Sequence, residues 1–388
     1  MKPKNEHETR IDLLQAKLRE SGVDGALIIY PVDVYYFCGT RQNSLLWVPA
    51  DAGPVLLVKK SLSRASAESS VTDVRPLPSS RDFPALFGSE IKRIGLMFDV
   101  LPVQQYTYYT GLLEGRELLD ISPVNRELRA IKSAWELEQM RLSGNRLSGI
   151  FSEVPSFLRP GMRELDLAAE FEYRLKKAGS EGYVRIRAFN QEIIGLAVSG
   201  ENAAIPGCFD GPVTGKGLSA AAPYGPSNDL IPQNVPIMID YAAIFNGYIV
   251  DMTRIFSFGS LAPELQSAFE TACGIQAWLV ENLRPGSTGE DLYRGAAAIA
   301  ESAGLGGHFM GHPGEQAKFV GHGVGLELDE LPVLAPKFRA PLQAGNTLAI
   351  EPKFVFPGRG VVGIENTYAI TTDGCELLTR CSDEIVYL

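Results

Sequence analysis

The apolar positions in the first third of the chain fall into short runs that are rich in β-branched and aromatic residues. Runs of this kind, separated by turn residues, predict strands. Before them, residues 9–21 show helical spacing, and Gly22 ends that helix. The pattern predicts an α/β domain over residues 1–128 with no cluster of His, Cys or carboxylates. Its strands are expected at residues 25–30, 34–38, 45–50, 54–60, 93–98 and 118–121.

The rest of the chain has longer amphipathic segments with strand-rich stretches between and after them. This pattern predicts an α+β domain over residues 138–388. A charged helical segment after Pro123 suits the connection, so we place a hinge at residues 129–137. The helices are expected at residues 126–142, 163–178, 263–283 and 288–303.

Composition narrows the class of protein. The chain has 388 residues, which favours two domains, and it is 45% hydrophobic, as globular proteins are. Its net charge of −10 argues against nucleic-acid and anionic membrane partners, which require clustered Lys and Arg. No segment approaches the ~20 apolar residues that span a bilayer. We expect a cytoplasmic protein that binds a small peptide or another small molecule.

The first candidate chemistry lies in VPIMIDYAAIFNGYIVDMTRIFSF. Asn-Gly between two strand-like runs is a strong hairpin signal. With these two residues as the loop, Asp240 pairs with Thr253 and Asp251 pairs with Ala242. The two carboxylates are then diagonal neighbours on one face, with Cα atoms ~7–8 Å apart. Each ends an apolar run, where an unpaired buried carboxylate is costly, so we expect a cation between them; a solvent-facing strand end is the alternative.

A second pair of acids lies in LAIEPKFVFPGRGVVGIENTYAI. Glu351 and Glu365 follow apolar strand segments on either side of a turn. A three-residue loop at 357–359 places Glu351 directly opposite Glu365. A two-residue loop at 358–359 would shift the pairing by one residue.

The fifth candidate is His322 in VGHGVGLELDELP. Its glycine neighbours leave the imidazole unobstructed. A lone histidine is more often structural, but four carboxylates and one imidazole form an oxygen-rich set suited to Mn(II), Fe(II), Co(II) or Zn(II). Two such ions ~3.5–4 Å apart activate water and polarise a carbonyl. The set Asp240, Asp251, His322, Glu351 and Glu365 therefore predicts a two-metal hydrolase.

These motifs, in this order, resemble the pita-bread metallopeptidases, a family that includes Xaa-Pro aminopeptidase, prolidase, methionine aminopeptidase and the metal-free creatinase. YIVDMTR is similar to its GY-x-x-D-x-T-R segment, GHGVGL to its histidine motif, and AIEP and IENT to its glutamate motifs. VYYFCGT is similar to a motif of the creatinase-type N-terminal domain, and KSAWELEQM resembles the hinge. The resemblance thus covers nearly the whole chain and implies a pita-bread catalytic domain.

The resemblance also implies roles. Asp240 would chelate one metal ion, Asp251 and Glu365 would bridge both ions, and His322 and Glu351 would bind the other. Glu351 would also take the proton of the bridging water as general base. Homodimers are common in the family.

Three positions depart from the family pattern. In SGENAAIPG, Gly207 stands where the family has a substrate-side histidine. In LDELP, Asp329 replaces a second histidine, and in VVGIEN, Gly363 replaces an arginine. The long loop 206–228 either supplies substitutes, such as Lys216, Tyr224 or Asn228, or is a surface insertion. His308 and His312 either compensate for the lost imidazoles or are ordinary loop residues.

Three functions fit these observations. The first is a dimetal peptidase of the Xaa-Pro type, which hydrolyses a peptide or amide bond. The second is a dimetal lyase or non-peptide hydrolase that uses Asp329 as base. The third is a non-catalytic protein that retains the metals and binds a peptide or partner.

Overall fold

The computed structural model describes residues 4–187 and 193–388. The described chain divides into two compact units. The first contains residues 4–129 and Arg187, and the second contains residues 130–186 and 193–388. Among the described helices, none combines the length and the apolar character that crossing a membrane requires.

The N-terminal unit is built on one mixed sheet. Its strands are β1 (Gly25–Ile28), β2 (Ser44–Pro49), β3 (Val55–Val58), β4 (Asp73–Pro76), β5 (Arg93–Leu96) and β6 (Glu117–Asp120). Its helices are α1 (Lys4–Glu20), α2 (Pro31–Cys38), α3 (Leu62–Glu68), η1 (Phe83–Leu86), α4 (Val103–Leu112) and most of α5 (Ser122–Ala130). The strand order is β4-β3-β2-β1-β5-β6, with β2 antiparallel to both of its neighbours and the other pairs parallel. The predicted α/β class is confirmed for this unit.

The predicted strand at residues 34–38 is wrong, because these residues form the second half of α2. Pro31 occupies the first turn of the helix, and Gly39 ends it with a left-handed φ of 86°. Six of its eight residues are buried. A helix buried on nearly every side has no polar stripe, so its aromatic and β-branched composition imitates that of a strand.

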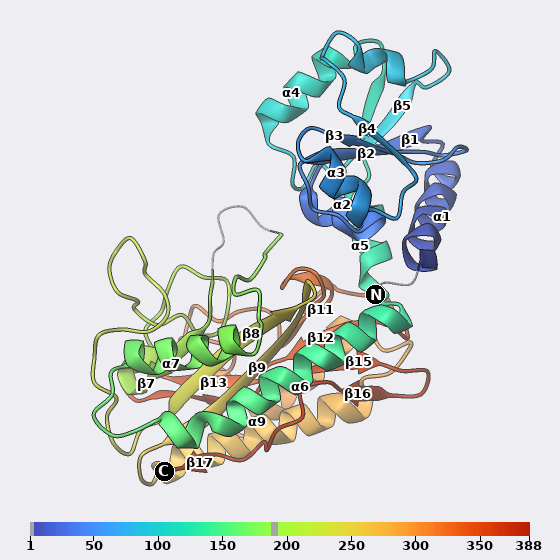
Figure 1. The fold of residues 1–388 in the computed structure, drawn as a ribbon. Helices are drawn as coiled ribbons and strands as arrows, with labels where there is room; N and C mark the ends of the chain where they lie inside the picture. Colours follow the sequence, from blue (N-terminus) through green and yellow to red (C-terminus); the bar gives the residue numbers. More distant parts are fainter. Residues whose placement is uncertain (1–3, 188–192) are drawn as a thin grey trace. The chain divides into compact units, whose positions relative to one another are not determined.

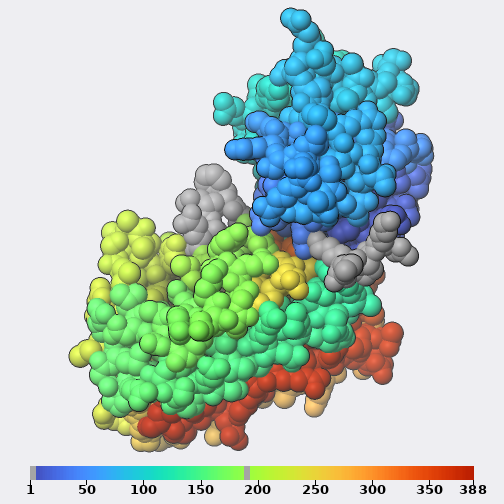
Figure 2. Space-filling model, viewed as in Figure 1, coloured from blue at the N-terminus to red at the C-terminus, as the bar shows by residue number. Residues whose placement is uncertain are grey.

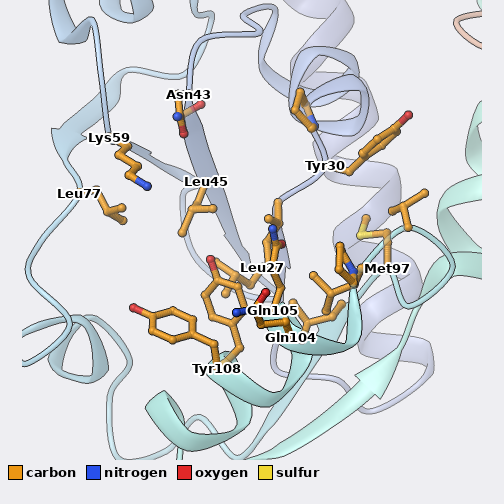
Figure 3. A pocket seen from close by; sticks show the side chains of 18 of the residues that line it. Leu27, Tyr30, Asn43, Leu45, Lys59, Leu77, Met97, Gln104, Gln105 and Tyr108 are labelled. Carbon is orange, nitrogen blue, oxygen red and sulfur yellow. The ribbon is translucent and has the colours of Figure 1, made fainter. Parts of the chain in front are cut away.

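A pocket of about 820 Å³ lies in the N-terminal unit (Figure 3). Gln104, Gln105 and Tyr108 of α4 line one part of it, and Asn43 and Lys59 lie beside the adjoining strands. Among the described residues that line it there is no His, Cys, Asp or Glu. The described residues that line this pocket therefore offer none of the side chains that commonly bind a metal ion.

The C-terminal unit contains a four-stranded sheet, a five-stranded sheet and a separate two-stranded hairpin. Its strands are β7 (Leu196–Ser199), β8 (Ile237–Phe245), β9 (Tyr248–Ser257), β10 (Gly321–Gly323), β11 (Glu330–Leu334), β12 (Thr347–Ile350), β13 (Lys353–Phe356), β14 (Gly360–Gly363), β15 (Asn366–Ile370), β16 (Cys375–Leu377) and β17 (Val386–Tyr387). The sheet orders are β17-β9-β8-β7 and β11-β10-β12-β15-β16, and β13 pairs with β14. A bridge between Thr253 and Glu365 joins β9 to the residue before β15, so the two larger sheets meet there.

Helices cover these sheets. They are α6 (Ala134–Phe157), α7 (Glu164–Lys177), α8 (Gly200–Ala203), α9 (Pro263–Asn282), α10 (Gly289–Ser302) and η2 (Gly306–His308). Figure 1 shows α6 running along β9, and it also packs on β8, while α7 packs on β7. In Figure 2 the green side chains of α6 and α7 form much of the near surface of this unit. On the other strands, α9 packs on β13 and β14 and α10 packs on α9, which encloses the main apolar core.

The helix predicted over residues 126–142 is two helices, α5 and α6, separated by residues 131–133. Ser133 starts α6 with a capping box. Its side chain accepts a hydrogen bond from the Glu136 backbone N–H (3.2 Å), and its own N–H donates to Glu136 Oε2 (3.0 Å). The break lies within the segment that we proposed as the hinge, residues 129–137.

Candidate metal centre

The hairpin of β8 and β9 positions two of the five predicted ligands. Asn246 and Gly247 form its two-residue turn with positive φ values of 52° and 86°, as a type I′ turn requires. The register pairs Asp240 with Thr253 and Asp251 with Ala242. The predicted register is therefore confirmed, and the two aspartates lie on the same face of the hairpin.

Glu351 and Glu365 lie opposite each other. The antiparallel strand pairs on either side of them have the same register. On one side Ile350 pairs with Asn366, and on the other Lys353 pairs with Gly363. Both ladders agree with the three-residue loop at 357–359 and not with the two-residue alternative. Each pair of acids thus lies across two antiparallel segments, as the sequence predicted.

His322 lies at the centre of the short strand β10, between β11 and β12. Its Nδ1–H donates to the carbonyl oxygen of Leu328 at 2.7 Å. Its Nε2 lies 3.7 Å from Glu351 Oε1 and 3.8 Å from Glu365 Oε1. The hydrogen bond at Nδ1 orients the ring so that Nε2 faces the two glutamates, which is how a metal-binding histidine is usually held.

Three of the five side chains converge as a compact ligand group. One ligand atom from each of Asp251, His322 and Glu365 lies within 4.8 Å of the other two. Asp251 is 7% exposed and Glu365 is 1% exposed, so the group is shielded from bulk water. Two carboxylates and one imidazole at this spacing fit a single divalent cation such as Mn(II), Fe(II), Co(II) or Zn(II).

The other two acids, Asp240 and Glu351, face a residue that we did not predict, Lys353. Its Nζ donates to Asp240 Oδ2 (2.9 Å), Glu351 Oε2 (2.7 Å) and Glu365 Oε2 (2.9 Å). The side chain of Lys353 is only 1% exposed. Burial by itself would lower the pKa of Lys353, but the three carboxylates outweigh it and hold the pKa well above its ordinary value. Lys353 is thus a buried cation among the predicted metal ligands.

A signal for Lys353 was present in the sequence. In a strand, residues two positions apart point to the same face. Lys353 follows Glu351 by two positions, and the register that pairs Glu351 with Glu365 also pairs Lys353 with Gly363. The same reasoning that placed the glutamates therefore places the lysine beside them.

The pKa values of the acids shift in different directions. Burial, followed by the charges of Glu365 and Asp240, raises the pKa of Asp251 well above its ordinary value. Burial also raises the pKa of Glu351, to about 7. Burial acts in the same direction on Glu365, but Lys353 and His322 outweigh it and lower its pKa to about 2. Glu365 is thus the acid that these cationic neighbours stabilise as a carboxylate, while the excess negative charge around Asp251 favours a further cation.

The other residues of the YIVDMTR motif hold the centre together. Thr253 Oγ1 donates to Glu365 Oε2 at 2.8 Å. Arg254 is buried and donates to the carbonyl oxygens of Thr253 (2.8 Å) and Glu365 (2.9 Å). It also donates to Asn366 Oδ1 at 2.9 Å. These bonds fix β9 against β15 and so fix the separation between the Asp and Glu ligands.

The structure also places the three positions that depart from the family pattern. Gly207 packs against Thr214, and a Cβ there would lie 2.3 Å from Thr214 Cγ2. Asp329 is half-buried and directly follows Leu328, whose carbonyl orients His322. Gly363 lies opposite Lys353, and a Cβ there would lie 2.7 Å from Lys353 Cγ. A side chain at Gly207 or Gly363 would require neighbouring atoms to move.

Loop 206–228 is tied to the domain through Glu164, which accepts hydrogen bonds from the backbone N–H and the hydroxyl of Ser227 at 2.9 and 2.7 Å. Within and beside the loop, Lys216 forms an ion pair with Asp229, and Asn228 accepts a hydrogen bond from Arg163 at 3.1 Å. Lys216 and Asn228 therefore have surface partners instead of contacts with the centre. The third candidate substitute, Tyr224, is half-buried.

The remaining loop histidines differ from each other. His308 donates from Nδ1 to the carbonyl of Val355 (2.8 Å) and stacks on Phe356, which is a structural role. His312 lines a cavity of about 30 Å³ together with Gly207. This volume holds about one water molecule. Only His312 therefore lies beside the position of a lost imidazole.

This architecture, with a carboxylate-rich centre between paired sheets and helices outside them, is the pita-bread metallopeptidase fold. The chain belongs to metallopeptidase family M24, which residues 138–372 match, and residues 10–131 match the creatinase/prolidase N-terminal domain. It is 26% identical over 380 residues to a Xaa-Pro dipeptidase of Pyrococcus furiosus, with 97% of this chain and 99% of the relative covered. An uncharacterised peptidase of Bacillus subtilis is 24% identical over 386 residues, with 98% of this chain and 100% of the relative covered.

Solved structures agree with this assignment of the fold. A prolidase from Pyrococcus horikoshii OT3 matches with a TM-score of 0.82 at 23% identity, over 97% of this chain and 100% of the other. A Xaa-Pro dipeptidase from Bacillus anthracis matches with a TM-score of 0.84 at 22% identity, over 98% and 100%. The creatinase-type N-terminal domain and the pita-bread catalytic domain predicted from the sequence are confirmed.

Proposed function

We propose that this chain is a metal-dependent hydrolase that cleaves a peptide or amide bond in a small substrate. The convergence of Asp251, His322 and Glu365 on one point carries the proposal. These three residues would hold a divalent cation, and Asp240 and Glu351 complete the acidic wall around it. A divalent cation bound there supplies Lewis acidity, which lowers the pKa of water and polarises a carbonyl.

Glu351 is the proposed general base. Its buried carboxylate lies beside the compact ligand group, with Oε1 3.7 Å from His322 Nε2, where it is placed to take a proton from water. Its Oε2 accepts a hydrogen bond from Lys353, so we assign the transferred proton to Oε1. Lys353 holds the carboxylate in one orientation while it takes and returns this proton.

The substrate class follows from what the centre lacks. Relatives named Xaa-Pro dipeptidase match this chain over nearly its whole length. The chain has Gly207 and Asp329 where the family pattern has imidazoles that contact substrate or move protons. We therefore propose small peptides or amides as substrates, without proline specificity, and a homodimer as the assembly.

A substrate panel tests the proposal. The purified chain, first stripped with EDTA and then supplied with Mn(II), is incubated with Xaa-Pro dipeptides, other dipeptides and N-terminal amides. We expect cleavage that requires the metal and that also occurs when the second residue is not proline. Complete inactivity of protein that has bound the ion would contradict the hydrolase and leave a lyase or a binding protein.

A further inference from the structure

The carboxylates of the centre already bind one cation, the Lys353 ammonium. A protonated lysine has three N–H donors, and here each of them is directed to a different carboxylate, on Asp240, Glu351 and Glu365. The three bonds measure 2.7–2.9 Å, which is the length of charge-assisted hydrogen bonds. The ammonium is therefore fully coordinated by acids that the sequence predicts as metal ligands.

We propose that Lys353 takes the place of one of the two metal ions, so that each chain binds a single divalent cation at Asp251, His322 and Glu365. This inference rests on the proposed function, because it concerns the same centre. It replaces the two-ion arrangement that the five ligands predicted. Glu365 contacts both the ammonium and the proposed cation site. Its Oε2 accepts a hydrogen bond from Nζ, and its Oε1 is directed towards His322.

The ligand geometry supports this division. The compact ligand group contains neither Asp240 nor Glu351, two acids that accept hydrogen bonds from Nζ. Unless it displaced Nζ, a second ion beside Asp240 could bind only the one oxygen of each carboxylate that Nζ does not contact. It would also lie close to a positive charge within a buried centre, where like charges repel strongly.

The net charge of the centre also supports a single divalent cation. Four carboxylates surround the centre, and the ammonium neutralises one of them. One divalent ion neutralises two more, which leaves one net negative charge. Two divalent ions together with the lysine would leave a net positive charge in a buried site, which is costly without further anions.

The backbone opposite Lys353 is shaped to admit this side chain. Gly363 is its direct cross-strand partner, and a Cβ there would lie 2.7 Å from both Cα and Cγ of Lys353. The family pattern has an arginine at the position of Gly363. In this chain Lys353 supplies the positive charge on this pair of strands, and its ammonium lies among the acids.

Metal counting tests the inference without reference to activity. The full-length protein is stripped with EDTA, saturated with Mn(II), freed of excess ion and analysed by inductively coupled plasma mass spectrometry. We expect one Mn per wild-type chain and two per chain in Lys353→Met, which is one atom shorter than lysine and removes its charge. Lys132→Met is the matched control, because Lys132 is equally buried and pairs with Glu330 instead of the acids of the centre; it should bind one.

Each outcome has a distinct meaning. Two Mn per wild-type chain would overturn the inference and leave the proposed hydrolase intact, whereas no bound Mn would overturn both. A folded Lys353→Met that still binds one ion would show that the lysine is not what excludes the second. If that variant fails to fold, electron paramagnetic resonance of wild-type protein decides: a single ion gives an uncoupled Mn(II) signal, and carboxylate-bridged ions give an exchange-coupled one.

Discussion

Lys353 and Gly363 face each other across the β13–β14 pair, and the absence of a side chain at Gly363 leaves room for the stem of the lysine. Beyond this pair, Nζ of Lys353 reaches three carboxylates, one of which follows Gly363 by only two residues. One glycine and one lysine therefore determine together how the acids of the centre are neutralised.

Gly363→Ala should destabilise the protein. The new Cβ would lie 2.6 Å from the carbonyl oxygen of Pro352 and 2.7 Å from Lys353 Cα, both of which are backbone atoms that cannot rotate away. Overpacking of this kind costs about 1–3 kcal/mol. Thermal unfolding followed by circular dichroism measures the effect. The control is Gly374→Ala, where a Cβ meets no atom within 4 Å and the melting temperature should stay close to that of the wild type; equal effects of the two substitutions would contradict the prediction.

His322→Ala should abolish metal-dependent hydrolysis and weaken Mn(II) binding by more than about 100-fold, because even the partners of a metal ligand contribute about 10–100-fold. Isothermal titration calorimetry and the dipeptide assay measure the two effects. His312→Ala is the matched histidine substitution, since His312 lies beside Gly207 and outside the ligand group. Its Mn(II) affinity should not change, and a loss as large as that of His322→Ala would refute our choice of ligand.

Asp329→Ala tests whether Glu351 or Asp329 is the base. If Glu351 is the base, removal of the Asp329 carboxylate should reduce peptide hydrolysis by less than about 10-fold, since a general base itself contributes about 10²–10⁴-fold. Steady-state kinetics on the best dipeptide substrate gives the factor. A reduction within the range of a general base, with Mn(II) still bound, would make Asp329 the base of the hydrolysis in place of Glu351.

The N-terminal unit should show a pH-dependent contribution from Asp24. Hydrogen bonds from the backbone N–H groups of Arg93 (2.8 Å) and Lys92 (2.6 Å) lower the pKa of Asp24 below its ordinary value of 3.8. Ionised Asp24 therefore stabilises the fold above that pH, and the stabilisation is lost as the pH falls through the lower folded pKa.

Asp24→Asn should accordingly lower the melting temperature at pH 7, and the difference from wild type should shrink as the pH falls below about 3.8. Asp51→Asn is the control, because Asp51 is 83% exposed and exposed ion pairs contribute little. A difference for Asp24→Asn that is constant with pH would show that the charge of Asp24 has no part in it.

Local rules were sufficient to predict the first carboxylate hairpin, and they left two registers open for the second. Asn246 and Gly247 have the positive φ values that a two-residue turn requires, so the turn fixes the register and the register fixes which residues share a face. For the second pair, the pairing of Ile350 with Asn366 in the β12–β15 pair decides the register that places Glu351 opposite Glu365. The grouping of acids was predictable because it depends on pairing alone.

Other features depend on contacts between distant residues. Helix α2 was read as a strand because tertiary burial removes the polar stripe by which helices are recognised. Thr214 fills the space at Gly207, and Glu164 holds Ser227, although no local pattern links these pairs. Lys353 was overlooked for another reason. A lysine in a strand is usually solvent-exposed, and only the combination of three acids makes its burial favourable.

The equal register of the strand pairs on either side of Glu351 and Glu365 separates these two acids from the hairpin tip. The pairing of β12 with β15 is maintained by its own hydrogen bonds, whatever the length of the turn at residues 357–359. Extra residues at that tip would bulge outwards and leave the glutamates in place. The tip is thus a position where the chain can vary in evolution, or carry an inserted label, without disturbing the chemistry below it.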